Sequence, residues 1–225
     1  LVNKTPYTIP KVYRCCSRDT VIGYTDLGNI LLWYNGMGKL SPTHWDSVNP
    51  IPTTDIRTDI VDNFLSDKDF KKLQERFTGS YGVGVDWYYS EYVASNKEET
   101  DNDFYMTHMI FAYPQGPISP TYNELMPMIS KLDPTSIIRI KANLFPNQGK
   151  LKEHVQHTDY AYPHQGAILY INTCDGYTLL EDGSRVSSVA NRMLFFDASK
   201  PHASTTTTNT KARININFNY HAFLK

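Results

Sequence analysis

The stretch that decides the fold is Arg213-Ile214-Asn215-Ile216-Asn217-Phe218-Asn219-Tyr220. Its apolar side chains alternate strictly with one arginine and three asparagines, which is the period of a β-strand. One face of this strand can therefore pack into a core. The other face is too polar for a packed interior, and its asparagines are too short for an ordinary solvated surface. We expect this strand to line a wet cavity.

Further strand patterns precede this one at regular intervals, with turn residues between them. Apolar, β-branched and aromatic runs occupy residues 137–144, 167–172, 177–180, 185–189 and 193–196. Short strands at such spacing predict a sandwich, a jelly roll or a barrel. The high content of tyrosine, phenylalanine and tryptophan (16, 10 and 3 residues) agrees, because aromatic side chains fit a pleated, half-buried surface.

Two helices are expected before this β-rich region. Ser66 can cap the first helix, Asp67 and Asp69 lie in its first turn, and Gly79 can end it. The second covers residues 124–132, with Pro127 tolerated in its first turn. Strand patterns at 86–93 and 104–112 lie between them. The predicted fold class is therefore α+β, mainly β, with supporting N-terminal helices.

The charge balance and the cysteines narrow the classes of function. The chain has 22 Lys and Arg against 23 Asp and Glu, so a nucleic-acid partner is not expected. It carries no apolar run long enough to span a membrane, and it begins at Leu1 without a basic-then-apolar leader. Its three cysteines include the adjacent pair Cys15 and Cys16, which does not suit a disulfide framework. We expect a reducing compartment and a cytoplasmic location.

The first part of the chain reads differently from the rest. Residues 21–24 and 30–34 are β-type runs joined by a turn-like sequence, and a proline-punctuated stretch follows them. A segment of this length would be marginal as an independent domain. We expect residues 1–55 to form a β-hairpin extension and linker, and residues 56–225 to form the main domain.

The residues that can carry chemistry begin with His157-Thr158-Asp159. In an extended segment, His157 and Asp159 project to the same side. His202 follows another strand pattern, and two histidines with one carboxylate form the facial triad of non-haem Fe(II) oxygenases. His154 is an alternative to His157, but no carboxylate stands two positions after it.

A candidate anion anchor lies on the alternating strand. Arginine offers carboxylates a bidentate fork, whereas lysine offers a point charge. Arg213 is embedded between apolar residues and is the better candidate. Lys211 has the same phase on a regular strand and remains an alternative.

These features occur in the order known from one enzyme family. The ordered set is residues 137–146, His157-Thr158-Asp159, residues 169–172, residues 191–197, Pro201-His202 and Arg213. It resembles the prolyl-4-hydroxylase-like branch of the 2-oxoglutarate/Fe(II)-dependent oxygenase superfamily, over about residues 58 to 221. The chain departs from that pattern in a longer interval from His202 to Arg213, and in Asn143-Leu144-Phe145 where a tyrosine-rich strand is usual.

The resemblance implies a double-stranded β-helix, that is, a cupin-like jelly roll. It makes His157, Asp159 and His202 the Fe(II) ligands and Arg213 the anchor of 2-oxoglutarate. Tyr170 matches a tyrosine that hydrogen-bonds the same carboxylate, although it can equally be a packed barrel residue. The implied reaction uses O2 to hydroxylate a C–H bond and releases succinate and CO2, with ascorbate as a reductant.

The resemblance leaves the substrate open. A protein or peptide side chain is expected, with proline as the first candidate, and a small molecule or a nucleic acid remains an alternative. A cupin-like metal-binding barrel without turnover is a further alternative, but a purely structural barrel has no use for a buried anion anchor such as Arg213. The oligomeric state is not predicted.

Overall fold

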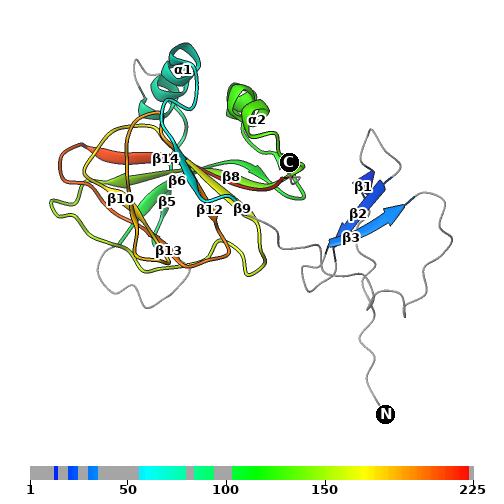
Figure 1. Cartoon of the computed structure of the whole chain (residues 1–225). Coiled ribbons are helices and arrows are strands. Elements are labelled where there is room, and N and C mark those ends of the chain that lie inside the picture. The colour runs from blue at the N-terminus through cyan, green and yellow to red at the C-terminus, as the bar shows by residue number, and fades with distance from the viewer. Residues whose placement is uncertain are drawn as a thin grey trace. The chain divides into compact units, whose positions relative to one another are not determined.

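The computed structural model describes residues 56–79, 84–93 and 103–222 in full, and the backbone of three short strands nearer the N-terminus. The chain divides into two compact units, residues 1–54 and 55–225. In the first unit, β1 (Tyr13–Arg14), β2 (Thr20–Tyr24) and β3 (Ile30–Tyr34) form an antiparallel sheet in chain order (Figure 1). Most of the predicted extension, including its connecting turn, lies outside the described residues.

The second unit contains two antiparallel sheets. The larger has the order β4-β12-β9-β14-β8-β6-β5, with β7 added beside β6, and the smaller has the order β11-β10-β13. The bounds of the larger sheet are β4 (Asp59–Val61), β5 (Tyr88–Ser90), β6 (Tyr105–Ala112), β7 (Gly116–Pro117), β8 (Ser136–Pro146), β9 (Gln165–Tyr170), β12 (Met193–Asp197) and β14 (Ala212–His221). Those of the smaller sheet are β10 (Tyr177–Leu180), β11 (Arg185–Ser187) and β13 (His202–Ser204). The predicted double-stranded β-helix is confirmed.

The first helix forms as its capping residues predict. α1 (Asp67–Thr78) begins after Ser66, whose hydroxyl accepts a hydrogen bond from the Asp69 amide at 3.2 Å. It ends at Gly79, whose φ of 70° is the left-handed conformation that glycine adopts without strain. Asp67 and Asp69 lie where the helix N-terminus favours negative charge.

The second helix is entered differently from the prediction. A 3-10 helix, η3 (Pro120–Leu125), comes first, and Ser119 caps it through the amide of Thr121. α2 (Met126–Leu132) follows directly, so it begins two residues later than predicted and keeps Pro127 in its first turn. Among the described residues, no helix has the length and hydropathy of a membrane span.

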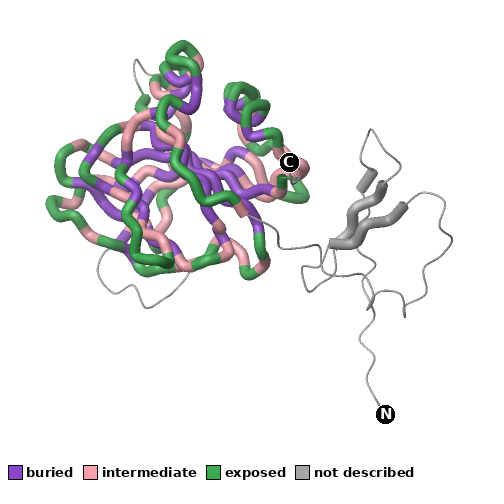
Figure 2. The backbone as a smooth tube through the Cα atoms, in the orientation of Figure 1, coloured by how far each residue is buried: buried purple, intermediate pink, exposed green. Residues whose placement is uncertain are grey.

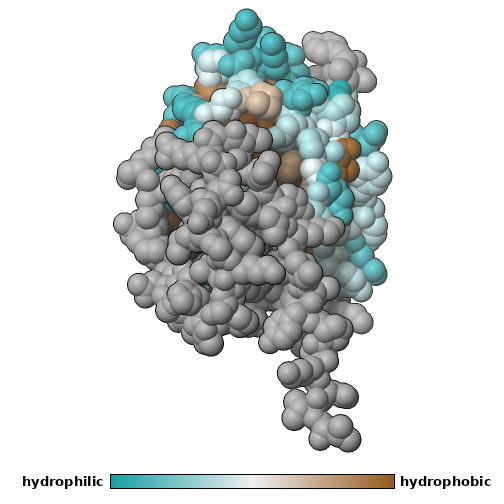
Figure 3. Space-filling view, turned by 90° about the vertical axis from the view of Figure 1, so that its right-hand side faces the viewer, coloured by the Kyte–Doolittle hydropathy of each residue, from teal (hydrophilic) through white to brown (hydrophobic). Residues whose placement is uncertain are grey.

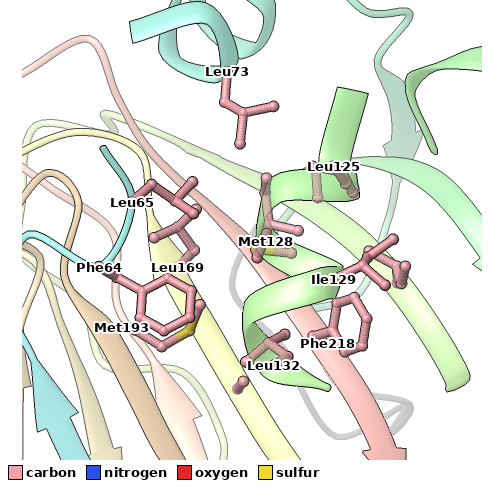
Figure 4. Close-up of a cluster of buried hydrophobic side chains, with 14 of the residues drawn as sticks. Phe64, Leu65, Leu73, Leu125, Met128, Ile129, Leu132, Leu169, Met193 and Phe218 are labelled. Atoms are coloured by element: carbon pink, nitrogen blue, oxygen red, sulfur yellow. The ribbon is translucent and has the colours of Figure 1, made fainter. Parts of the chain in front are cut away.

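The two helices pack on the apolar face of the larger sheet (Figures 1 and 2). Leu73 of α1 and Met128 of α2 point into the same cluster as Leu169 of β9 and Phe218 of β14 (Figure 4). All four are at most 1% exposed, and burying a side chain of this size stabilises the fold by about 1.5–3 kcal/mol. The coloured part of the surface in Figure 3 is mostly hydrophilic.

The opposite face of β14 carries the polar residues of the deciding stretch. In the antiparallel register with β8, Arg213 lies opposite Phe145, Asn215 opposite Asn143, Asn217 opposite Lys141 and Asn219 opposite Arg139. The amide of Asn143 donates to the side-chain oxygen of Asn215 at 2.9 Å, which joins the two strands on this face. We call the inward face formed by Arg139, Lys141, Asn143, Arg213, Asn215, Asn217 and Asn219 the polar ladder. It supports the candidate site.

Candidate active site

The structure brings His157 and His202 together through their backbones. Each residue donates its amide N–H to the carbonyl of the other, at 2.9 Å in both directions. This pairing sets the two imidazole rings 4.6 Å apart between centroids. Asp159 follows two residues later on the same side, with its Oδ2 4.0 Å from Nε2 of His202. The ligand atoms of all three side chains lie within 4.8 Å of one another, the one such cluster in the described part of the chain.

A hydrogen bond orients the ring of His202, and burial sets the charge of His157. Nδ1 of His202 lies 2.9 Å from the carbonyl oxygen of Lys200, which can only accept, so this nitrogen carries the proton. In the neutral ring Nε2 therefore keeps its lone pair toward Asp159. For His157, burial and the neighbouring His202 lower the pKa to about 4, so its ring is neutral at pH 7.

Three donors hold the carboxylate of Asp159. Arg139 donates to Oδ1 at 2.5 Å, and the side-chain amides of Asn217 and Asn219 donate to Oδ2 at 3.0 and 2.8 Å. Burial alone would raise the pKa of Asp159, but the charge of Arg139, the ring of His202 and the Asn217 amide outweigh it and keep the pKa well below its usual range. Asp159 is therefore an ionised carboxylate in a fixed orientation.

These three donors were not identified from the sequence. The asparagines were expected only to face a cavity, and Arg139 was an unassigned residue of a strand pattern. The pattern of alternation in residues 137–144 does place Arg139, Lys141 and Asn143 on one face. What the pattern does not contain is the register that sets Arg139 opposite Asn219 and both beside Asp159.

Arg213 is the largest fully buried side chain among the described residues. Its Nη2 donates to the hydroxyl of Thr178 at 2.9 Å, whereas Nε and Nη1 are buried without a hydrogen-bond acceptor. Its guanidinium carbon lies 5.4 Å from the ring centroid of Phe145 and 5.5 Å from that of Tyr170. Burial without a counter-ion lowers the pKa of Arg213. Lys211, the alternative anchor, is exposed.

Glycine at position 176 makes room for this arginine. A Cβ atom on Gly176 would lie 2.6 Å from Cδ of Arg213 and 2.7 Å from the carbonyl oxygen of Thr206. Real Cβ atoms do not approach neighbours so closely, so a larger residue at position 176 would displace the side chain of Arg213 or the backbone at Thr206.

Tyr170 lies beside Arg213 and is also fully buried. Its hydroxyl donates to Thr178 at 2.8 Å, so Tyr170 and Arg213 share one acceptor. Burial raises the pKa of the Tyr170 hydroxyl, which stays protonated. Tyr170 is thus a packed barrel residue whose hydroxyl lies beside the guanidinium of Arg213.

His154 does not join the histidine–aspartate cluster. Its ring stacks on Phe145 at 5.4 Å between centroids, and its Nδ1 lies 2.9 Å from the hydroxyl of Ser204. The structure therefore selects His157 over His154 as the residue that faces Asp159 and His202.

A single cavity connects the cluster with the polar ladder. Its walls include His157, Asp159, His202, Lys141, Asn217 and Thr178. Two imidazoles and an ionised carboxylate match the donor set that Fe(II) oxygenases use. Nε and Nη1 of Arg213, which lack an acceptor among the described residues, suit a carboxylate, and Thr178, which accepts from Nη2, also lines the cavity. These residues therefore fit both Fe(II) and the dianion 2-oxoglutarate.

Comparison with known proteins supports the fold. No family model matches the sequence, and no curated protein matches it. Among solved structures, a prolyl hydroxylase of Trichoplax adhaerens, in complex with a hypoxia-inducible-factor peptide fragment, matches with a TM-score of 0.54 and 15% identity, over 80% of this chain and 86% of that chain. The non-haem α-ketoglutarate-dependent epimerase of nogalamycin biosynthesis matches with a TM-score of 0.50 and 11% identity, over 72% of this chain and 75% of that chain.

The fold and the polar site thus define a class, the double-stranded β-helix proteins with a histidine–aspartate–histidine cluster. Within that class, the chain has the fold of the 2-oxoglutarate/Fe(II)-dependent oxygenases, including that of a prolyl hydroxylase. The resemblance that the sequence motifs predict is confirmed at the level of the fold.

Proposed function

We propose that this protein is a non-haem Fe(II)- and 2-oxoglutarate-dependent dioxygenase that hydroxylates a C–H bond and releases succinate and CO2. The observation that carries the proposal is Arg213, a fully buried cation with two unpaired donors, in the same barrel as the metal-ligand cluster. A buried charge without a partner is costly, so this arrangement makes physical sense when an anion completes it. A non-catalytic cupin-like barrel would not need it.

The residues that would hold Fe(II) are His157, Asp159 and His202. When bound with 2-oxoglutarate and O2, the metal supplies the oxidising chemistry, and the chain supplies ligand geometry and a shielded site. Arg139, through its contact with Asp159, keeps the carboxylate ionised and oriented. The carbonyl of Lys200 keeps the metal-facing nitrogen of His202 unprotonated.

The far carboxylate of 2-oxoglutarate would pair with Arg213, whose Nε and Nη1 have no hydrogen-bond acceptor in the described part of the fold. Tyr170 and Thr178 are already joined beside that guanidinium, and rotation of either hydroxyl would give the carboxylate a further donor. This role for Tyr170 adds to its packing role.

For the substrate we propose a protein or peptide side chain, with proline first, because the fold is shared with a prolyl hydroxylase. A small-molecule substrate is the second candidate, since the α-ketoglutarate-dependent epimerase shares the fold as well. In this proposal residues 56–225 form the dioxygenase domain, residues 1–55 are an extension, and ascorbate serves as a reductant.

The test is succinate formation from 2-oxoglutarate with Fe(II) and ascorbate, in the presence of a panel of proline-containing peptides. Wild-type protein should release succinate, and His157→Ala and Asp159→Ala should abolish the release. Asp182→Ala removes an exposed carboxylate and is the matched control that should retain it. A wild-type protein that binds Fe(II) but yields no metal-dependent succinate with the whole panel would contradict the proposal.

A further inference from the structure

A lysine lines the cavity that the histidine–aspartate–histidine cluster faces. Lys141 stands on β8 directly opposite Asn217, two positions after Arg139 and four positions before Phe145. It lines the cavity together with His157, and its ammonium lies 3.2 Å from the hydroxyl of Tyr105. Lys141 is thus placed beside the metal-ligand cluster, whereas Arg213 is at the opposite end of the polar ladder.

Lys141 has no acidic partner in the part of the chain that the structure describes, in contrast to Arg139 and Lys152. Arg139 pairs with Asp159 at 2.5 Å, and Lys152 pairs with Asp103 at 2.7 Å. Within residues 56–79, 84–93 and 103–222, no carboxylate lies within 4.0 Å of the Lys141 ammonium. The residue is half-buried, and its ammonium has no ion pair within these ranges.

The groups assigned to the reaction do not neutralise Lys141. The charge of Asp159 is balanced by Arg139, and the far carboxylate of 2-oxoglutarate is balanced by Arg213. The near carboxylate and keto group of 2-oxoglutarate face the metal. Lys141 is thus left without an assigned anion, and a carboxylate of the substrate can supply one.

Hydrogen-bond acceptors flank this cation. The amide nitrogen of Asn217 donates to Asp159, which fixes the orientation of that side chain, and its Oδ1 is buried without a donor. Oδ1 of Asn143, two positions from Lys141 on the same face, is also buried without a donor. A ligand that places an N–H group close to its carboxylate would satisfy both the cation and these oxygens.

We propose that Lys141 binds an α-carboxylate of the substrate. The nitrogen on the α-carbon next to that carboxylate then donates hydrogen bonds to the side-chain oxygens of Asn217 and Asn143. This assignment rests on the proposed function and specifies its substrate class. A free α-amino acid and the C-terminal residue of a peptide share this chemistry. A neutral internal peptide segment lacks the carboxylate.

Binding to the intact protein tests the assignment. Titration calorimetry is done without O2 on full-length protein loaded with Fe(II) and saturated with 2-oxoglutarate. The probes are L-alanine for a free amino acid, N-acetyl-L-alanine for a peptide C-terminus, and the two matching carboxamides. At least one carboxylate probe should bind the wild type at least about tenfold more tightly than it binds Lys141→Met, a difference of roughly 1.4 kcal/mol.

The carboxamides should bind both proteins equally, Lys141→Arg should retain the carboxylate binding, and Lys150→Met, at an exposed lysine, should match the wild type. Whichever of the two carboxylate probes binds more tightly identifies the source of the carboxylate. Equal affinity of wild type and Lys141→Met for both carboxylate probes would overturn the assignment. So would a tenfold loss of 2-oxoglutarate affinity in Lys141→Met, because Lys141 would then serve the co-substrate.

Failure of the proposed function has a separate signature. In that case 2-oxoglutarate would bind wild type and Arg213→Met equally, whatever the result at Lys141.

Discussion

Replacing Arg213 by methionine is expected to stabilise the ligand-free protein and to remove its affinity for 2-oxoglutarate. Arg213 is fully buried, and its Nε and Nη1 have no acceptor. Each unsatisfied buried donor costs about 1–3 kcal/mol, and the unpaired charge adds to that cost. An apolar side chain of similar length carries neither cost.

The substitution also removes favourable contacts, which set the size of the effect. The guanidinium loses its positions over the rings of Phe145 and Tyr170, worth about 0.5–2 kcal/mol. Thr178 loses one donor but keeps the hydroxyl of Tyr170 at 2.8 Å, so no new unsatisfied group is created. Replacing buried charges by apolar residues often stabilises proteins by about 1–4 kcal/mol, and we expect a gain in this range.

Urea unfolding with and without 2-oxoglutarate, in the presence of Mn(II), measures both parts of this prediction. For the wild type, ligand at one hundred times its Kd should add about 2.7 kcal/mol to the free energy of unfolding, and for Arg213→Met it should add nothing. Arg185→Met, at a side chain that is 65% exposed, is the control for loss of an arginine. If ligand-free Arg213→Met is less stable than the wild type by about 3 kcal/mol, the charge is compensated within the fold and the reasoning is wrong.

Three further predictions concern the groups around this arginine and the metal site. Arg139→Met should lower the free energy of unfolding at pH 7 by about 3–5 kcal/mol, because it leaves Asp159 buried without its counter-ion. Since the pKa of Asp159 is depressed in the folded state, wild-type stability from this pair is lost as pH falls below its ordinary value of 3.8, so the deficit seen in urea titrations should be smaller there than at pH 7. Gly176→Ala should displace Arg213 and so weaken 2-oxoglutarate binding, measured by calorimetry, while Fe(II) binding stays unchanged. If the variant binds 2-oxoglutarate as tightly as the wild type does, the close packing at Gly176 is refuted. His202→Ala should abolish Co(II) absorption bands that the wild type shows, and retained bands would exclude His202 as a ligand.

The sequence predicts those parts of the fold whose signals are local. The alternation at 213–220 predicts both faces of β14, and Ser66 and Gly79 predict the ends of α1. The spacing of His157 and Asp159 predicts that both point to one side, because a strand-like backbone has a period of two. Each of these follows from neighbours in the chain.

Features that depend on pairing between distant segments could not be predicted in the same way. Arg139 and Asp159 are near in sequence, but Asn219 reaches the same carboxylate only because β8 and β14 pair in one register. Thr178 of β10 and Gly176, which directly precedes that strand, come to Arg213 from a distant part of the chain, and no local pattern marks them. The 3-10 entry to α2 was likewise missed, because Ser119 and Pro120 start a turn that also suits a loop.

The three cations of the polar ladder, Arg139, Lys141 and Arg213, differ in whether the fold supplies their anion. Arg139 has its anion within the fold, so its removal should cost stability whether or not ligand is present. Arg213 and Lys141 lack a carboxylate partner among the described residues, so they weaken the ligand-free protein and favour whatever brings the missing charge. In the proposed function, the two carboxylates of 2-oxoglutarate pair with Arg213 and the metal, so the anion for Lys141 has to come from a different molecule. Replacing Arg213 should therefore raise the free energy of unfolding and lower the affinity for 2-oxoglutarate. Replacing Lys141 should raise the free energy of unfolding and lower the affinity for the substrate carboxylate. Replacing Arg139 should change only the free energy of unfolding, when 2-oxoglutarate binding is measured with the metal already in place.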